Sequence, residues 1–323
     1  MALGVYDPSG MYSRWAGVTV TSIFANTKSR VNVTILHDAT LTDDNRRRFE
    51  RTAERFGQSV DFLDVSQHVD RLAPDVAKVS HGYTRGTLFR LLIPEVMNVP
   101  KVIYLDCDIV VNTDIADMWS IPFDRACAVA SIPWHSRPRT VLEWAMGFGP
   151  EDIFNAGVMV MNLDQIREMP PMPAAAFRFF KRWGRLAYHA DNHFLPRYFR
   201  GRVSFIDKRF NRGLFHRSTE NRIDLDGAVL HYAGSQPWET PRNTEADRLF
   251  WRTFAESEWG DLLFDTVLAL YDKKYVRTRQ CVSLLVSRVP MFLNPALLLR
   301  VPFVRNVLLV LNKVWHVLRG EDE

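Results

Sequence analysis

The most informative stretch of the chain is Lys101-Val102-Ile103-Tyr104-Leu105-Asp106-Cys107-Asp108-Ile109-Val110-Val111. Its apolar, β-branched residues have no helical period, which is typical of a buried strand. Two aspartates, Asp106 and Asp108, stand at the carboxyl end of the apolar run. Residues two apart in an extended chain point to the same side, so the two carboxylates are expected side by side. Two adjacent carboxylates at the carboxyl end of a buried strand predict a divalent-cation site, because open α/β sheets bind ligands there and unpaired acids are costly in apolar surroundings. Two solvated acids at a strand exit are an equally good interpretation of this short motif alone.

Strands and helices alternate in the first part of the chain. Thr42 is expected to cap a helix that stops at Gly57. Residues 17–24 are ambiguous, because their β-branched content favours a strand whereas their spacing also permits a helix. The resulting order βαβαβ implies an α/β fold with a parallel sheet. The expected strands are short and apolar, and they lie at residues 2–7, 31–37, 59–65, 127–133, 158–163, 203–207 and 228–232.

Three further segments carry polar residues next to expected strands. Arg90 lies in the apolar segment 81–92, and Asn155 precedes Ala-Gly at the start of a strand. The Asn is either a turn residue or the mark of a place where a ligand approaches the backbone. His231 ends the strand 228–232 and is followed by a Gly-rich polar turn. A lone His on such a strand is more often a core residue than a ligand.

The composition is that of an ordinary globular protein, with 323 residues, 47% hydrophobic and 24% charged. The three cysteines have no metal-ligand spacing, which favours a reducing compartment. The start of the chain has neither a basic region nor a long apolar core, so no signal peptide is expected. No apolar window of about 18 residues is free of charge, so no membrane-spanning helix is expected either.

The net charge of +4 is distributed unevenly. Residues 273–319 contain nine Lys or Arg and no acid, so the rest of the chain carries a net charge of −5. Within this tail, residues 303–319 alternate so that polar and apolar side chains occupy opposite sides of a helix. A basic amphipathic helix favours binding to an anionic membrane surface. A terminal helix packed on the main domain is the alternative.

Taken together, these segments resemble the family 8 glycosyltransferases over roughly residues 3–240. The resemblance is carried by four motifs in the right order and spacing, each of them weak alone. They are Leu88-Phe89-Arg90-Leu91-Leu92-Ile93-Pro94, Val102-Ile103-Tyr104-Leu105-Asp106-Cys107-Asp108, Phe154-Asn155-Ala156-Gly157-Val158, and His231-Tyr232-Ala233-Gly234 followed by Pro237-Trp238.

The resemblance implies a GT-A fold, with a mixed, mostly parallel sheet flanked by helices, and a retaining hexosyltransferase. The donor would be a UDP-sugar, usually UDP-glucose or UDP-galactose. The metal would be Mn²⁺, or Mg²⁺ in its place, held by Asp106, Asp108 and His231. Two carboxylates, one imidazole and the diphosphate oxygens suit Mn²⁺, which would stabilise the UDP leaving group.

The resemblance also assigns residues around the donor. Asp191, Asn155 and Asn192 would orient the sugar and are the candidate catalytic residues. The candidate nucleotide-sugar contacts match positions of the family motifs, and one of them is also a candidate metal ligand. They are Asp7, Tyr12, Arg90, Asp106, Ala156, Gly157, Gly234 and Gln236.

Three positions depart from the family pattern. His193 stands where the family often has a second acid, and this difference is expected to affect the specificity for the acceptor or for the sugar. Gln236 replaces a Lys before Pro-Trp, so a positive charge near the phosphates is lost. The segment from Asp7 to Tyr12 has one acid where the family usually has two. The sequence does not identify any residue as a nucleophile. Same-face attack by the acceptor is therefore favoured over a covalent intermediate on Asp191.

These observations predict a GT-A catalytic domain at residues 1–258 and a helical region at residues 259–323. The expected function is transfer of glucose or galactose to a glycan or glycolipid acceptor in bacterial surface polysaccharide synthesis, such as lipopolysaccharide or capsule. We expect a cytoplasmic protein, peripheral on the inner membrane through its tail, that binds no nucleic acid. The alternatives are a non-catalytic nucleotide-sugar-binding protein and a sugar-nucleotide pyrophosphorylase, although the turn after residue 7 is a poor phosphate loop.

Overall fold

The chain forms two compact units, Met1–Phe264 and Asp265–Glu323. The helix predicted at residues 303–319 lies outside the residues that the computed structural model describes. Those residues are 1–71, 85–130, 146, 148, 154–183, 187, 191–214, 224–234, 236–239 and 244–270.

The first unit is built on a seven-stranded sheet of order β3-β2-β1-β4-β7-β6-β8. Neighbouring strands are parallel except β7, which runs antiparallel to both β4 and β6. This arrangement confirms the predicted mixed, mostly parallel sheet. The strands are β1 (Ala2–Val5), β2 (Asn32–His37), β3 (Ser59–Asp64), β4 (Lys101–Leu105), β6 (Cys127–Ala130), β7 (Val158–Asn162) and β8 (Val203–Ile206).

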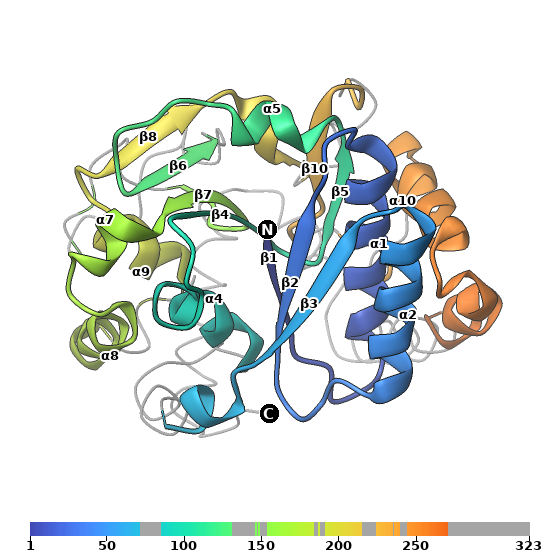
Figure 1. Cartoon of the computed structure of the whole chain (residues 1–323), viewed down its shortest axis with the longest axis horizontal. Coiled ribbons are helices and arrows are strands. Elements are labelled where there is room, and N and C mark those ends of the chain that lie inside the picture. Colours follow the sequence, from blue (N-terminus) through green and yellow to red (C-terminus); the bar gives the residue numbers. More distant parts are fainter. Residues whose placement is uncertain are drawn as a thin grey trace, which may run out of the picture. The chain divides into compact units, whose positions relative to one another are not determined.

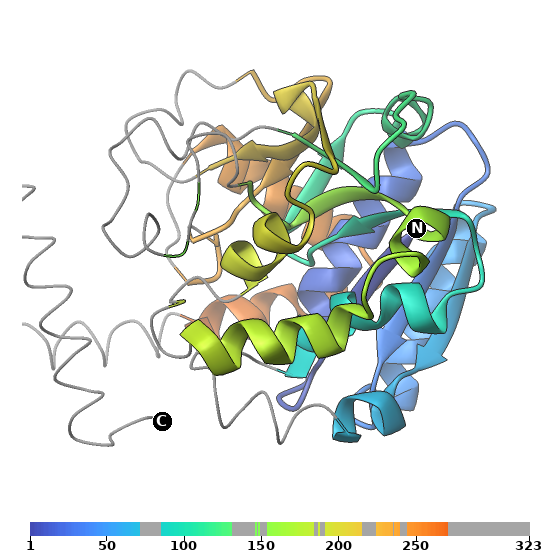
Figure 2. The same cartoon turned by 90° about the vertical axis from the view of Figure 1, so that its left-hand side faces the viewer.

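Helices cover both faces of this sheet. Figure 1 shows α1 and α2 on one side of the first three strands and α4 on the other, and Figure 2 shows α8 beside α9 at the outer surface. The apolar side chains of these helices close the core on both faces. The α-helices are α1 (Tyr12–Asn26), α2 (Asp43–Arg55), α4 (Arg85–Val96), α5 (Ile115–Trp119), α7 (Leu163–Arg167), α8 (Met172–Trp183), α9 (Asp191–Tyr198) and α10 (Glu245–Glu256).

A small second sheet has the order β5-β10-β9, with β5 (Ile109–Asn112), β9 (Arg212–Gly213) and β10 (Ala228–His231). The strand that starts at Lys101 therefore ends at Leu105, and the chain enters a different sheet at Ile109. The amide of Asp106 donates to the Gly157 carbonyl at 2.8 Å, and the Asp108 carbonyl accepts from the amide of Tyr232 at 2.9 Å. The two acids therefore bridge the two sheets, and each is held by a different one.

Residues 17–24, whose composition favoured a strand, are helical and belong to α1. Their hydroxyl groups explain the unusual composition. The Thr19 hydroxyl lies 3.1 and 2.8 Å from the backbone carbonyls on either side of Asp108. The Ser22 hydroxyl accepts from the amide of Val111 at 2.9 Å. The polar face of α1 thus supplies the hydrogen bonds that a neighbouring strand would otherwise give to the free edge of β5.

The end of the first unit is anchored beneath α1 and α2 by Trp259. This residue is the first of the helical region predicted at residues 259–323, yet its side chain is fully buried. Its indole nitrogen donates to Asn45 Oδ1 at 2.9 Å. A Cβ added to Gly17 would lie 2.3 Å from the indole ring, so α1 needs a glycine where the two groups meet.

Candidate functional site

The three predicted metal ligands come together at the junction of the two sheets. Asp106 follows β4, Asp108 precedes β5, and His231 ends β10. One potential ligand atom from each lies within 4.8 Å of the others. His231 Nε2 is 3.1 Å from Asp108 Oδ1. Two carboxylates and an imidazole at this spacing form a donor set suited to a divalent transition metal.

Gly157 leaves the space that this cluster needs. Because β7 is antiparallel to β4, the turn that precedes β7 lies beside the carboxyl end of β4. A Cβ at Gly157 would lie 2.2 Å from His231 Cε1 and 2.8 Å from Asp106 Oδ2. Any side chain there would fill the volume between two of the candidate ligands, so the residues present fit a bound cation.

His231 and Asp108 shift each other's pKa. Burial opposes protonation of His231, but the adjacent Asp108 carboxylate outweighs it and raises the pKa of the imidazole. Burial likewise opposes ionisation of Asp108, yet the charge and hydrogen bond of His231 lower the pKa of this carboxyl group. A cation that binds here takes the place of the proton between the two residues.

Arg90 on α4 connects the candidate metal ligands to α9 through hydrogen bonds and an ion pair. Its guanidinium donates to Asp106 Oδ1 at 2.7 Å, to the Ala156 carbonyl at 3.2 Å, and lies 2.9 Å from Asp191 Oδ2. Burial opposes the charge, but the two carboxylates raise the pKa of Arg90, so it stays protonated. The Tyr104 hydroxyl also donates to Asp106 Oδ1, at 2.7 Å. Asp106 Oδ1 is thus fully engaged, and Oδ2 is the oxygen that faces Gly157.

The first turn of α9 carries two of the three predicted catalytic residues, Asp191 and Asn192, and the third, Asn155, lies in the turn before β7. Burial raises the pKa of Asp191, although Arg90 opposes the rise. Asn192 Oδ1 accepts from the Ala156 amide at 2.9 Å and so supports the turn before β7. His193, where the family often has an acid, is fully buried, and its ring stacks on Phe148 with the centroids 5.9 Å apart.

The predicted nucleotide contacts lie near the ends of β1 and β10. Both oxygens of Asp7 accept backbone amides at the start of α1, from Tyr12 at 2.8 Å and from Ser13 at 2.9 Å. Asp7 therefore caps this helix, a role that the sequence did not indicate. Gln236 donates to Asp108 Oδ2 at 3.2 Å, after a turn in which Gly234 has φ of 69°.

Two residues of the site were missed by sequence reasoning. Tyr104 lies two residues before Asp106, and strand alternation alone could have placed both on one side. Asn211 accepts a hydrogen bond at the ring of His231, with 2.9 Å between Oδ1 and Nδ1. It comes from a distant 3₁₀-helix, Lys208–Asn211, and no local pattern singles it out.

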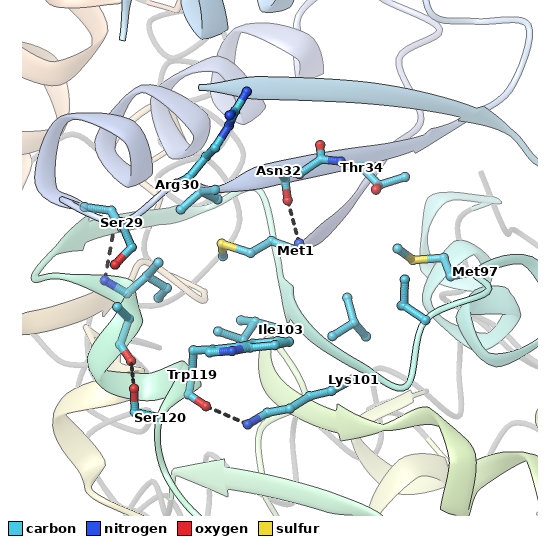
Figure 3. Close-up of a pocket in the computed structure, with 16 residues that line it drawn as sticks. Met1, Ser29, Arg30, Asn32, Thr34, Met97, Lys101, Ile103, Trp119 and Ser120 are labelled. Carbon is cyan, nitrogen blue, oxygen red and sulfur yellow. Dashed lines mark hydrogen bonds between the residues drawn. The ribbon is translucent and has the colours of Figure 1, made fainter. Parts of the chain in front are cut away.

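A cavity of about 530 Å³ lies at the opposite edge of the sheet, lined by the amino ends of β2 and β4 and by Trp119. Figure 3 shows Lys101 beside Trp119, with its ammonium donating to the Trp119 carbonyl at 2.5 Å. None of the candidate metal ligands lines this cavity. It is therefore separate from the candidate site.

Sequence comparison identifies the family. The model of glycosyl transferase family 8 matches residues 5–241, which include every motif of the candidate site. The chain belongs to glycosyl transferase family 8. Membership confirms the predicted resemblance and the prediction of a hexosyltransferase.

Several known proteins are similar to this chain over most of their length. A putative glycosyltransferase from Haemophilus influenzae is 23% identical over 240 residues, covering 71% of this chain and 70% of the relative. General stress protein A from Bacillus subtilis is 22% identical over 250 residues, covering 71% and 84%. A crystal structure of the galactosyltransferase LgtC with donor and acceptor sugar analogs has a TM-score of 0.66 at 20% identity, covering 79% of this chain and 95% of that one. This structural similarity confirms the GT-A fold.

Contact with a membrane was expected through the basic segment of residues 273–319. Among the described residues, no helix is long and apolar enough to cross a membrane. The basic segment 273–319 lies outside those residues, so its predicted membrane helix stays a prediction.

Proposed function

We propose that this protein is a metal-dependent retaining hexosyltransferase that uses a UDP-sugar and Mn²⁺, with Mg²⁺ as the alternative cation. The observation that carries the proposal is the convergence of Asp106, Asp108 and His231 around the space left by Gly157. When bound there, the cation supplies Lewis-acid stabilisation of the departing diphosphate. In this proposal Asp106 Oδ2, Asp108 and His231 Nε2 are its protein ligands.

The sugar of the donor is assigned to the side of the cluster formed by Arg90, Asn155 and the first turn of α9. Arg90 Nε is buried and has no hydrogen-bond partner among the described residues, which leaves a donor for the ligand. Asp191 is held by Arg90 at 2.9 Å. A carboxylate engaged in a buried ion pair is better suited to orienting the sugar than to attacking it. We therefore favour same-face attack by the acceptor, with Asp191, Asn155 and Asn192 as orienting residues.

The acceptor is proposed to be a glycan or glycolipid of a bacterial surface polysaccharide, reached from the cytoplasmic side of the inner membrane. The amphipathic pattern of residues 303–319 supports this part of the proposal. Membership of a transferase family disfavours the pyrophosphorylase alternative. A non-catalytic sugar-nucleotide binder would bind the donor without turning it over.

The test is donor turnover in the Asp108→Ala and His231→Ala variants of the full chain. Both variants are expected to lose Mn²⁺-dependent sugar transfer while retaining cooperative thermal unfolding. If either variant keeps the wild-type rate, or if the wild type keeps its rate with EDTA present, the metal assignment is wrong. If the wild type binds a UDP-hexose but neither transfers nor hydrolyses it, the non-catalytic alternative holds.

A further inference from the structure

Two buried carboxamides, Asn155 and Asn211, connect the turn before β7 to the ring of His231. The Gly157 amide donates to Asn155 Oδ1 at 2.9 Å. Asn211 Nδ2 lies 3.3 Å from the same oxygen and 3.5 Å from the Asn155 carbonyl. Asn211 Oδ1 is 2.9 Å from His231 Nδ1. The three side chains are 5% or less exposed, so bulk water does not replace these partners.

The direction of this chain of hydrogen bonds is fixed by backbone groups. A backbone N–H can only donate and a backbone carbonyl can only accept. The Gly157 amide therefore requires the oxygen of Asn155, and the Asn155 carbonyl requires the amino group of Asn211. The oxygen of Asn211 must then face His231. An amide oxygen can only accept, so Nδ1 of the ring carries a hydrogen.

We propose that Asn155 and Asn211 form a directional amide relay that holds the hydrogen on His231 Nδ1 and thereby reserves Nε2 for the cation. The relay rests on the proposed function in assigning the cation to Nε2. In its absence, the Asp108 carboxylate, 3.1 Å from Nε2, favours a hydrogen on that nitrogen. Asn211 is thus a positioning residue, and it has no contact with the donor in this scheme.

The relay also changes the interpretation of Asn155. Its oxygen is used by Gly157 and Asn211, so any contact with the donor sugar must come from its amino group. The same residue then touches the sugar side of the site and sets the direction of the relay. Metal-ligating histidines generally need such a partner on the second ring nitrogen, and its loss typically weakens metal binding 10–100-fold.

The first experiment needs no metal. The full chain, labelled with ¹⁵N-histidine, is studied by NMR on the alkaline side of the His231 titration, where the neutral ring carries a single hydrogen, and the His231 signals are identified from their loss in His231→Gln. We expect a slowly exchanging Nδ1–H in the wild type and rapid exchange of that hydrogen in Asn211→Leu. The relay is wrong if the wild-type Nδ1–H exchanges rapidly, or if Asn211→Leu leaves it protected.

The second experiment measures Mn²⁺ affinity by calorimetric titration of the full chain. Asn211→Leu is expected to bind Mn²⁺ about 10–100-fold more weakly, and Asn211→Asp, which keeps an acceptor, is expected to stay closer to the wild type. The matched control is Asn45→Leu, which removes a similarly buried amide whose partners are Asp7 and Trp259. Its affinity should be unchanged.

Several outcomes overturn the relay. They are an Asn211→Leu protein that is folded and binds Mn²⁺ like the wild type, and an equal loss of affinity in Asn45→Leu. If Asn211→Leu does not fold, Asn155→Ala breaks the first link and must also weaken Mn²⁺ binding. A wild type that binds no Mn²⁺ refutes the proposed metal dependence instead, and the exchange experiment then decides on the relay alone.

Discussion

Replacing Gly157 with alanine should remove metal binding through a single added carbon atom. That Cβ would lie 2.2 Å from His231 Cε1, whereas an ordinary contact begins at 3.4 Å. The ring, or the turn before β7, must therefore move by about 1.2 Å, while metal–ligand distances tolerate shifts of only about 0.2 Å. We expect at least a 100-fold loss of Mn²⁺ affinity, since losing a mere partner of a ligand already costs up to about 100-fold. The crowding should also destabilise the fold by about 1–3 kcal/mol.

The assay is calorimetric titration with Mn²⁺, accompanied by urea unfolding. Gly17→Ala is the matched control, because its added Cβ would lie 2.3 Å from Trp259, away from the candidate metal ligands. This variant should lose about 1–3 kcal/mol of stability and keep the Mn²⁺ affinity of the wild type. If Gly157→Ala binds Mn²⁺ within a few-fold of the wild type, the cation does not occupy the space beside this glycine.

Three further predictions concern the charges of the site. Arg90→Leu leaves Asp106 and Asp191 without their buried partner, so the free energy of unfolding, measured in urea, should fall by about 3–5 kcal/mol. A fall of less than about 1 kcal/mol would show that water already screens these carboxylates. Mn²⁺ affinity, measured between about pH 5.5 and 8.5, should increase as the pH rises through the raised pKa of His231 and then level off, because the cation must displace a proton from the ring. Without metal, the ion pair of His231 with Asp108 stabilises the fold fully below the unfolded pKa of 6.5, and this contribution is lost as the pH rises through the raised folded value. Affinity that does not vary with pH would remove His231 from the ligand set.

The parts of the fold that follow local rules could be predicted from the sequence. Thr42 caps α2 through its side chain, as expected, and accepts from the Asn45 amide. The strand β4 ends at Leu105, directly before the Asp-x-Asp motif. The convergence of this motif with His231 could be anticipated because the order of motifs matched a known family, although the two belong to different sheets.

The parts that depend on distant partners could not be predicted. The Thr and Ser residues of α1 looked like strand residues because their role, hydrogen bonding to the free edge of β5, exists only in the folded chain. Asn211 carries no local pattern, and only the packing of its 3₁₀-helix against β10 brings it to His231. Asp7 could be aligned with a nucleotide contact, but its use as a helix cap needed the position of α1.

The central claim is that the cluster at the junction of the two sheets binds a UDP-sugar together with a cation. Its most direct test is a thermal-shift panel of UDP-, GDP- and TDP-hexoses, each with and without Mn²⁺, because a ligand that binds only the native state raises the unfolding temperature more, the tighter it binds. We expect a large rise only when a UDP-hexose and Mn²⁺ are present together, and no such rise in Asp108→Ala. An equal shift without Mn²⁺, or an equal shift with a GDP- or TDP-hexose, would contradict it.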